Sequence, residues 1–162
     1  MSLFSGPSRM IVEEASLDDA PLLAEIHASA FARIWSEAEF AALLAGPGVF
    51  AIAVRSRSVF GARRTVGFVL FRVAAGEAEI LTIAVRPGSR RRGHGRLLME
   101  EALRRLYRDR ISACFLEVDR ANRAAVALYR SLGFVVAGER KRYYSEPQSG
   151  DGAALVMRVQ LR

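Results

Sequence analysis

The chain is poor in cysteine and histidine, and these shortages exclude whole classes of structure. Cys114 is the only cysteine among 162 residues, so neither an intramolecular disulfide nor a cysteine-based metal cluster can form. The two histidines, His27 and His94, are too few for a structural zinc site, and we expect no metal. We expect the Cys114 thiol to pack inside the protein as a small apolar side chain.

Long apolar runs are also absent. No stretch approaches the roughly 18 apolar residues that span a bilayer. Residues 1–9 contain no apolar core of signal-peptide length. We therefore expect a cytoplasmic protein that does not associate with a membrane. The composition, 51% hydrophobic and 25% charged, is that of an ordinary globular protein, and the length predicts one domain over residues 1–162.

Lysine is almost missing, although the chain is strongly basic. Lys141 is the only lysine, and 24 Lys and Arg residues against 17 Asp and Glu residues produce a net charge of +7. GC-rich codons alone would favour arginine in this way. An anionic partner, such as a nucleotide cofactor or a ribosomal particle, would also select for it, and the two explanations are compatible. Because no segment resembles a DNA-reading element, we expect no direct nucleic-acid substrate.

A short glycine-containing segment is the most informative part of the chain. The segment from Arg90 to Gly95 reads Arg-Arg-Arg-Gly-His-Gly and lies between an apolar run over residues 80–85 and a helix-like run over residues 97–107. Glycine lets backbone N–H groups approach a ligand closely, and a helix N-terminus adds unpaired donors and partial positive charge. The arrangement therefore predicts a site for a diphosphate-bearing ligand. The alternative is a solvated turn before a helix.

Hydrophobic spacing and turn signals predict a mixed-sheet α/β domain. Ser16 and Ser36 each precede a helical pattern as capping residues, and Asn122 can cap a further helix. Residues 55–64 are polar and basic, which predicts an exposed hairpin loop, whereas the apolar run 113–118 suits a strand buried on both faces. The expected element order is βααββββαβαββ, with a mostly antiparallel central sheet followed by a β-α-β crossover.

This order and two sets of motifs resemble the GNAT acetyltransferase superfamily over nearly the whole chain. The superfamily's loop pattern, Gln/Arg-x-x-Gly-x-Gly/Ala, is matched by Arg90, Gly93 and Gly95. A second set is similar to the RimI-like branch, the ribosomal-protein-alanine N-acetyltransferases. It consists of Leu116-Glu117-Val118, Asn122, Ala127-Leu128-Tyr129-Arg130-Ser131-Leu132-Gly133-Phe134, Trp35-Ser36-Glu37 and Arg142-Tyr143-Tyr144.

The resemblance implies that acetyl-CoA is the acetyl donor. Its pyrophosphate would bind the N–H groups of residues 91–96, and its pantetheine arm would pair with the backbone of residues 83–85. The cofactor-binding residues so implied are Ile83, Ala84, Val85, Arg90, Arg91, Arg92, Gly93, His94, Gly95, Arg96 and Asn122. Two alternatives stay open: residues 83–85 can serve as core strand residues, and Asn122 can act as a helix cap.

The resemblance also implies a general base and a general acid. It assigns the base to Glu117, although a carboxylate within an apolar strand can instead form a core ion pair with an arginine. It assigns the acid to Tyr129, which would protonate the leaving thiolate, although helical spacing also suits a core aromatic side chain. Cys114 has no base beside it in the sequence, so we expect direct transfer in a ternary complex rather than through an acyl-cysteine.

Three aromatic residues, Trp35, Tyr143 and Tyr144, lie in or near expected loops, where they can bind a peptide or close the core. By resemblance, the acceptor is the N-terminal α-amino group of a protein, namely the N-terminal alanine of a small-subunit ribosomal protein. An α-amino group has a pKa of about 7.7–8.0, against about 10.4 for lysine, so a modest base suffices for it. Two alternatives remain: acetylation of a small-molecule amine or a lysine side chain, and a CoA-binding scaffold with little catalysis. The sequence does not indicate an oligomeric state.

Overall fold

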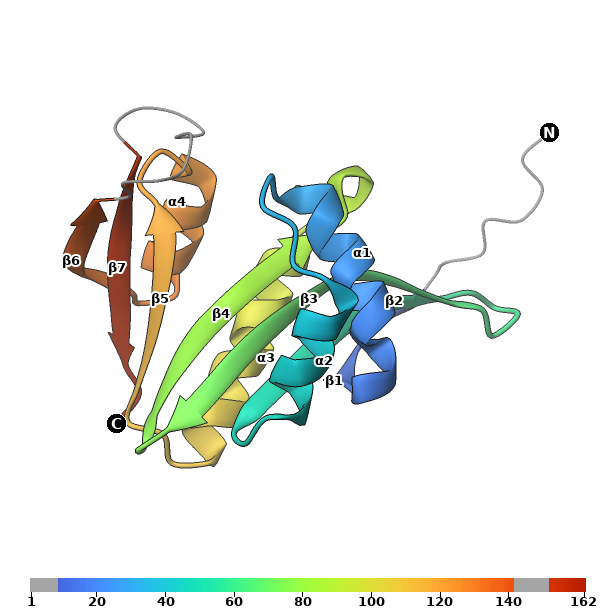
Figure 1. The fold of residues 1–162 in the computed structure, drawn as a ribbon, viewed down its shortest axis with the longest axis horizontal. Helices are drawn as coiled ribbons and strands as arrows, with labels where there is room; N and C mark the ends of the chain where they lie inside the picture. Colours follow the sequence, from blue (N-terminus) through green and yellow to red (C-terminus); the bar gives the residue numbers. More distant parts are fainter. Residues whose placement is uncertain (1–8, 142–151) are drawn as a thin grey trace. The chain divides into compact units, whose positions relative to one another are not determined.

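The computed structural model describes residues 9–141 and 152–162 and forms a mixed α/β fold (Figure 1). Its strands are β1 (Arg9–Ala15), β2 (Val49–Arg57), β3 (Arg63–Ala74), β4 (Glu77–Val85), β5 (Ala113–Asp119), β6 (Val135–Lys141) and β7 (Ala153–Gln160). Its helices are α1 (Ala20–Ala30), α2 (Glu37–Ala45), α3 (His94–Arg108) and α4 (Arg123–Ser131), and two short 3₁₀ turns are η1 (Leu17–Asp19) and η2 (Pro87–Ser89). No helix in these ranges is long and apolar enough to cross a membrane.

The predicted fold class is confirmed, but the predicted order contained one strand too many. Three strands, β2 to β4, lie between α2 and α3, where four were expected. The segment 55–64 forms no separate element, because β2 continues to Arg57 and β3 begins at Arg63. A tight turn joins the two strands, in which the Ser58 N–H donates to the Ala62 carbonyl at 2.9 Å. The exposed loop is therefore shorter than predicted.

The strands form one mixed sheet in the order β1-β2-β3-β4-β5-β7-β6. Strands β1 and β2, β2 and β3, β5 and β7, and β6 and β7 pair antiparallel, which confirms the mostly antiparallel sheet. Strands β4 and β5 are parallel, and their register runs from Glu77 opposite Ala113 to Glu79 opposite Phe115. A helical crossover through α3 supplies the connection that a parallel pair requires.

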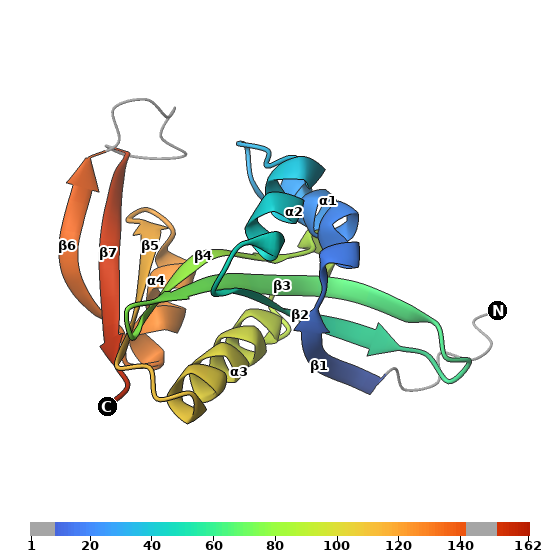
Figure 2. The same ribbon diagram turned by 60° about the horizontal axis from the view of Figure 1, so that its bottom comes forward.

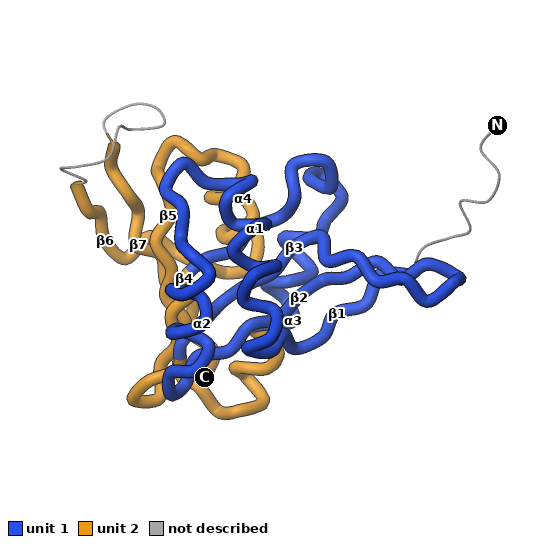
Figure 3. The backbone as a smooth tube through the Cα atoms, turned by 45° about the vertical axis from the view of Figure 1, so that its right-hand side comes forward, with its two compact units in different colours: residues 1–72, 82–102 blue, residues 73–81, 103–162 orange. Residues whose placement is uncertain are grey.

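The chain divides into two compact units (Figure 3). Unit 1 comprises Met1–Arg72 and Thr82–Ala102, and unit 2 comprises Val73–Leu81 and Leu103–Arg162. Within unit 1, α1 and α2 lie on one face of the strands and the first turns of α3 lie on the other (Figure 2). Apolar side chains from these layers are buried between them, among them Leu23, Ile26, Phe40, Phe68, Leu98 and Met99.

Unit 2 has its own core. Strands β5 and β7 pair along their whole length, from Ala113 opposite Gln160 to Asp119 opposite Ala154. Helix α4 adds the buried Tyr129, and Gly133, two residues after the helix ends, lies beside β7, where a Cβ would contact Val159 at 3.4 Å. The other buried apolar side chains of this unit include Leu106, Cys114, Leu116, Val118, Phe134 and Met157.

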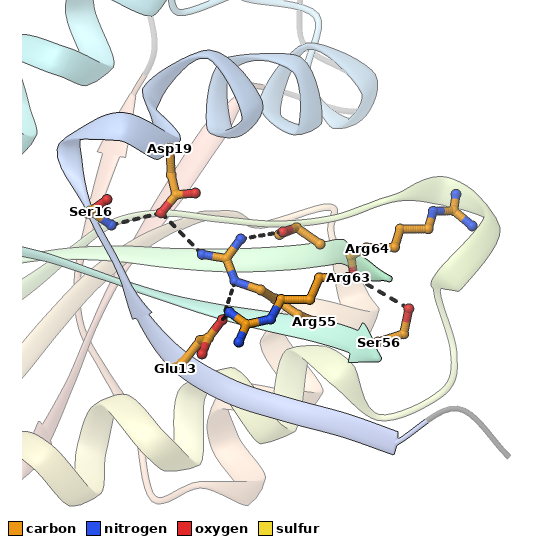
Figure 4. A network of polar contacts seen from close by, with 8 residues as sticks. Glu13, Ser16, Asp19, Arg55, Ser56, Arg63 and Arg64 are labelled. Carbon is orange, nitrogen blue, oxygen red and sulfur yellow. Dashed lines mark hydrogen bonds and ion pairs between the residues drawn. The ribbon is translucent and has the colours of Figure 1, made fainter. Parts of the chain in front are cut away.

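Arg55, which was expected in an exposed loop, is buried at the centre of a polar network in unit 1 (Figure 4). Its guanidinium donates to the Thr65 hydroxyl at 2.6 Å and to Asp19 Oδ2 at 3.1 Å. Its Nε lies 2.8 Å from Glu13 Oε1, although the N–H does not aim at that oxygen closely enough for a hydrogen bond. The prediction failed for Arg55 because two carboxylates from other segments offset the cost of burying its charge.

Both predicted capping motifs form. The Glu39 N–H donates to the Ser36 hydroxyl at 3.1 Å, and the Ser36 N–H donates to the Glu39 carboxylate at 3.0 Å. This reciprocal capping box starts α2, as the sequence predicts. The Ser16 N–H donates to Asp19 at 2.8 Å, and the chain first makes the turn η1 there before α1 begins at Ala20.

Candidate functional site

The predicted phosphate loop leads directly into a long helix in unit 1. Gly93 has a φ of +80°, a left-handed conformation that favours glycine, and Arg91 has a φ of +62°. The first intrahelical hydrogen bond of α3 runs from the Leu97 N–H to the Gly93 carbonyl at 3.0 Å. The N–H groups of His94 and Gly95 therefore lie in the first turn, where a helix has no acceptor for them. This geometry suits the binding of an anion.

Arg86 anchors the start of this loop, a role that the sequence analysis did not identify. Its N–H donates to the Val66 carbonyl and its Nε donates to the Thr65 carbonyl, both at 2.8 Å. Its Nη1 lies 2.9 Å from Glu25 on α1. Three contacts from one residue thus join the end of β4 to β3 and α1. The position of Arg86 directly before Pro87 carries no sequence signal for such contacts.

The four basic side chains of the loop do not behave alike. The Nε of Arg90 donates to the Val85 carbonyl at 3.3 Å, so its stem turns back toward β4. Arg91 and Arg92 are exposed. His94 is half-buried, and this burial, together with the charge of Arg92, lowers its pKa, so that the ring is neutral at pH 7. An anion at this loop would therefore meet arginine charges and backbone N–H groups rather than an imidazolium.

The strand that precedes the loop packs unusually closely against β3. Ala84 is buried, while Ile83 and Val85 are half-buried. A Cβ on Gly67 would lie 2.8 Å from the Ala84 carbonyl oxygen and 3.3 Å from the Val85 Cα. Because Ala84 is buried, its side chain belongs to the core, which was the alternative interpretation of residues 83–85. The register of β4 with β5 ends at Glu79 and does not include residues 83–85.

Glu117 occupies a more open position than a strand buried on both faces would allow. Along β5, Cys114, Leu116 and Val118 are buried on one face, whereas Phe115 and Glu117 on the other face are only partly covered. Counted with its backbone, Glu117 is exposed, and its side chain retains 29% of its accessible surface. The prediction of a doubly buried strand is therefore wrong, because one face of β5 follows the alternation of a half-covered sheet.

Arg140 is the charged neighbour of Glu117. Its Nη1 lies 3.5 Å from Glu117 Oε2, and its side chain is 69% exposed. The register explains the pairing: Glu117 lies opposite Val156, Val156 lies opposite Gly138, and Arg140 is two residues further along β6 on the same face. The ion pair with an arginine, which was one alternative for Glu117, does form, but at the surface instead of in the core.

Tyr129 is held by the C-terminal cap of α4. The Gly133 N–H donates to the Arg130 carbonyl and the Phe134 N–H donates to the Tyr129 carbonyl, both at 3.0 Å, which is a Schellman motif. Gly133 has a φ of +96°, and the rings of Tyr129 and Phe134 pack with centroids 5.9 Å apart. Tyr129 is 6% exposed, and burial raises its pKa to about 12. Its phenol is therefore fully protonated at neutral pH.

Asn122 and Cys114 complete the candidate residues of unit 2. The Asn122 side-chain oxygen accepts from the Ala125 N–H at 3.2 Å, so this residue caps α4 and its amide NH₂ remains for another partner. Cys114 is buried, and burial followed by the charge of Glu79 raises its pKa to about 12. A thiol with this pKa is a poor nucleophile at pH 7, which agrees with transfer that bypasses cysteine.

Trp35 belongs to an aromatic cluster of unit 1 that contains a buried histidine. The His27 ring stacks on Phe31 at 4.5 Å and on Trp35 at 4.8 Å, and Phe40 meets both His27 and Trp35. Trp35 is half-buried, so it both covers the core and presents a surface. Burial lowers the pKa of His27, and its Nδ1 has no hydrogen-bond partner within the described residues. The other two predicted acceptor-binding residues, Tyr143 and Tyr144, lie outside the described residues.

The predicted residues therefore form two sets. Unit 1 holds residues 83–85 and 90–96 as one continuous segment, together with Trp35, and unit 2 holds Glu117, Asn122 and Tyr129. Sequence reasoning missed Arg86, Arg140 and His27, whose contacts arise from other strands or from ring stacking. Within residues 9–141 and 152–162, no group of three His, Cys, Asp or Glu side chains could hold a metal ion.

Known proteins resemble this chain in both sequence and structure. Ribosomal protein bS18-alanine N-acetyltransferase of Salmonella typhimurium is 39% identical over 93 residues, which cover 57% of this chain and 63% of that enzyme. The match thus spans less than two thirds of that relative. N-alpha-acetyltransferase RimI of Mycobacterium tuberculosis is 38% identical over 132 residues, which cover 78% of each protein. The crystal structure of the ribosomal-protein-S18-alanine N-acetyltransferase from Escherichia coli has a TM-score of 0.83 at 30% identity, over 94% of both chains.

More distant structures share the fold. Arabidopsis thaliana NAA60 in complex with acetyl-CoA has a TM-score of 0.81 at 16% identity. The family pattern described as acetyltransferase (GNAT) matches residues 20–134, which is more than half of the chain. That stretch begins at α1 and ends at Phe134, so it includes the phosphate loop, Glu117 and Tyr129. This chain belongs to the GNAT acetyltransferase family.

Proposed function

We propose that this protein transfers an acetyl group from acetyl-CoA to the α-amino group of a ribosomal protein's N-terminal alanine. The observation that carries this proposal is the Glu117 carboxylate, which an apolar strand presents on its partly open face beside the exposed Arg140. The exposed ion pair with Arg140 stabilises the fold by at most about 1 kcal/mol, which is a weak structural reason for a carboxylate in this apolar strand. The acceptor follows from the relatives, which are named as alanine N-acetyltransferases of a ribosomal protein.

Unit 1 would bind the donor, which supplies the acetyl thioester. The first-turn N–H groups of α3 at His94 and Gly95, with Gly93 in its left-handed conformation, fit a pyrophosphate. The exposed Arg91 and Arg92 add positive charge at the same loop. Residues 83–85 would pair with the pantetheine amides through their backbone. The Asn122 side-chain oxygen caps α4, and its NH₂ group would donate a hydrogen bond to the donor.

Unit 2 would move two protons. The Glu117 carboxylate accepts a proton from the acceptor amine as the amine nitrogen bonds to the acetyl carbon. The Tyr129 hydroxyl donates a proton to the sulfur as the carbon–sulfur bond breaks, so the products are an amide and a free thiol. The high pKa of Tyr129, about 12, ensures that this proton is present at pH 7. Its own reprotonation follows from solvent or from the amine-derived proton.

Trp35, Tyr143 and Tyr144 would bind the acceptor peptide. The half-buried ring of Trp35 supports this role, because one side stacks on His27 and part of its surface stays accessible to a peptide. We infer that residues 1–162 act as one N-acetyltransferase domain, because the family match crosses both units. We also infer a cytoplasmic location, since the donor and the proposed ribosomal acceptor occur together there.

A peptide panel tests the proposal. The protein is incubated with acetyl-CoA and peptides that begin with alanine, serine or blocked alanine, each with one internal lysine, and mass spectrometry locates the acetyl group. We expect acetylation of the free N-terminal alanine and loss of about 10²–10⁴-fold in rate for Glu117→Gln. Acetylation of lysine alone would assign the enzyme to lysine side chains, and CoA binding without any acetylation would make it a scaffold. Either result contradicts the proposal.

A further inference from the structure

Three arginines lie directly opposite one another at one end of the sheet in unit 1. In the register of the strands, Arg9 of β1 is opposite Arg57 of β2, and Arg57 is opposite Arg63 of β3. Residues that face each other in an antiparallel pair have side chains on the same face, and like charges in such pairs are destabilising. The repulsion among these three guanidinium groups therefore lowers the stability of the folded state.

Few acidic groups offset this row. Glu13 lies 3.2 Å from Arg63, but the same carboxylate oxygen also lies 2.8 Å from Arg55 (Figure 4). Arg9 and Arg57 are both exposed, and Arg64 adds a further exposed arginine on the neighbouring position of β3. Among the described residues, the arginines that form ion pairs at this end of the sheet are Arg55 and Arg63. The end therefore carries an excess of positive charge.

The hairpin tip beside these arginines presents two apolar side chains to solvent. Phe60 is 88% exposed and Val59 is 68% exposed. The tip is nevertheless an ordered turn, because the Gly61 N–H donates to the Ser58 carbonyl at 2.9 Å and the Ala62 N–H donates to the Ser58 hydroxyl at 3.2 Å. The hairpin also extends beyond the helices of unit 1 (Figures 1 and 2). An aromatic ring in this position contributes nothing to the core.

We propose that this arginine hairpin, defined as residues 57–64 together with Arg9, is a docking surface for RNA. The guanidinium groups would bind phosphate oxygens, which removes their mutual repulsion, and Phe60 would stack on an unpaired base. An acidic protein surface would also attract the charge, whereas single-stranded RNA combines phosphate charge with unpaired bases that stack on an exposed aromatic ring such as Phe60. RNA matches both features at once. The proposal concerns docking and does not depend on the acetyltransferase activity.

Binding is measured by fluorescence anisotropy of a labelled RNA stem-loop with a single-stranded tail, over a salt series. We expect Arg57→Gln/Arg64→Gln to reduce the slope of log Kd against log salt by about 1.5, since each phosphate contact contributes about 0.7–0.9. We expect Phe60→Ser to weaken binding about tenfold at fixed salt without a change in slope, and Phe60→Trp to retain affinity. All these side chains are exposed, so the variants should fold.

The control is Arg72→Gln/Arg108→Gln, which lowers the net charge by the same amount at exposed arginines outside the hairpin. Equal weakening by this control and by Arg57→Gln/Arg64→Gln would overturn the proposal, because it would mean that general charge binds RNA. Unchanged binding by Phe60→Ser, with poly-L-glutamate competing as well as RNA, would also overturn it in favour of an acidic protein. Acetylation of free peptides should be unchanged in every variant, and a higher thermal midpoint is expected for Arg57→Gln as the repulsion is relieved.

Discussion

Arg140 Nη1 and Glu117 Oε2 lie 3.5 Å apart on β6 and β5, with β7 between the two strands. The strand register explains the pair, because the antiparallel pairing of β5 with β7 and of β7 with β6 places both residues on one face of the sheet. It joins the proposed base to the strand that leads into Tyr143 and Tyr144. We expect Arg140 to act as a positioning residue for the proposed base, because it is an ion-pair partner of Glu117 and has no proposed contact with the reacting atoms.

Replacement of Arg140 should affect catalysis far more than stability. An exposed ion pair stabilises a protein by about 0–1 kcal/mol, so Arg140→Met should change the free energy of unfolding by less than about 1 kcal/mol. We expect kcat to fall several-fold because the Glu117 carboxylate loses its restraint, while KM for acetyl-CoA stays constant. Arg140→Lys should restore part of the rate. An unchanged kcat in Arg140→Met, measured with a free peptide, would show that the pair plays no part in catalysis.

Tyr129→Phe should separate the hydroxyl from the ring. The ring fills the core beside Phe134 and is kept, so stability at pH 7 should change little. A lost general acid lowers kcat by about 10²–10⁴-fold. Affinity for CoA, measured by calorimetry, should be unaffected. Full activity would assign Tyr129 to the core alone.

The same substitution should alter stability at high pH. The folded-state pKa of Tyr129, about 12, lies above the ordinary value of 10, because burial disfavours the phenolate. Its contribution to folding is therefore fully present below pH 10 and is lost as the pH rises from 10 through about 12. Cys114, raised from 9 to about 12, acts in the same direction from pH 9 upward.

We therefore expect Tyr129→Phe and Cys114→Ala each to flatten the decline in urea unfolding midpoint between pH 9 and pH 11. The comparison is made within each variant, so a constant loss from the smaller alanine side chain does not obscure the slope. A decline identical to that of the unsubstituted protein in both variants would mean that other groups titrate in this range.

Gly67→Ala should displace the strand that precedes the phosphate loop. The added Cβ would lie 2.8 Å from the Ala84 carbonyl oxygen, which is backbone and cannot rotate away. Overpacking of this kind costs about 1–3 kcal/mol, and we expect weaker binding of CoA as residues 83–85 shift. Gly88→Ala is the matched control, because a Cβ there meets nothing within 4 Å. Equal CoA affinity in both variants would place the donor away from β4.

Arg55→Met should lower the free energy of unfolding more than Arg63→Met does. Removal of Arg55 leaves Glu13 and Asp19 without the cation that lies between them, and their side chains retain only 32% and 22% exposure. We expect a loss of about 2–3 kcal/mol, below the full cost for buried pairs because water still reaches both carboxylates. Arg63 is 53% exposed, so its replacement should cost less than about 1 kcal/mol. Urea unfolding of both variants measures the difference.

Much of the chain could be predicted because its signals are local. The Ser36 capping box, the glycine loop before α3 and the stop at Gly133 each involve contacts within about five residues, so the residue types themselves specify the structure. The environment of Arg55 could not be predicted in this way. A polar, basic segment predicts loop, but cross-strand partners from distant segments can turn it into a paired strand.

The sequence by itself determined the fold class, the capped helices and the resemblance that identified the phosphate loop, Glu117 and Tyr129, because these depend on residue types at short spacing. Only the tertiary structure decided which face of β5 is open and which arginine meets Glu117. It likewise decided that Tyr129 is buried and that Arg9, Arg57 and Arg63 align in one row. Burial and charge pairing depend on strand register between segments that are distant in the chain, and no local pattern encodes that register.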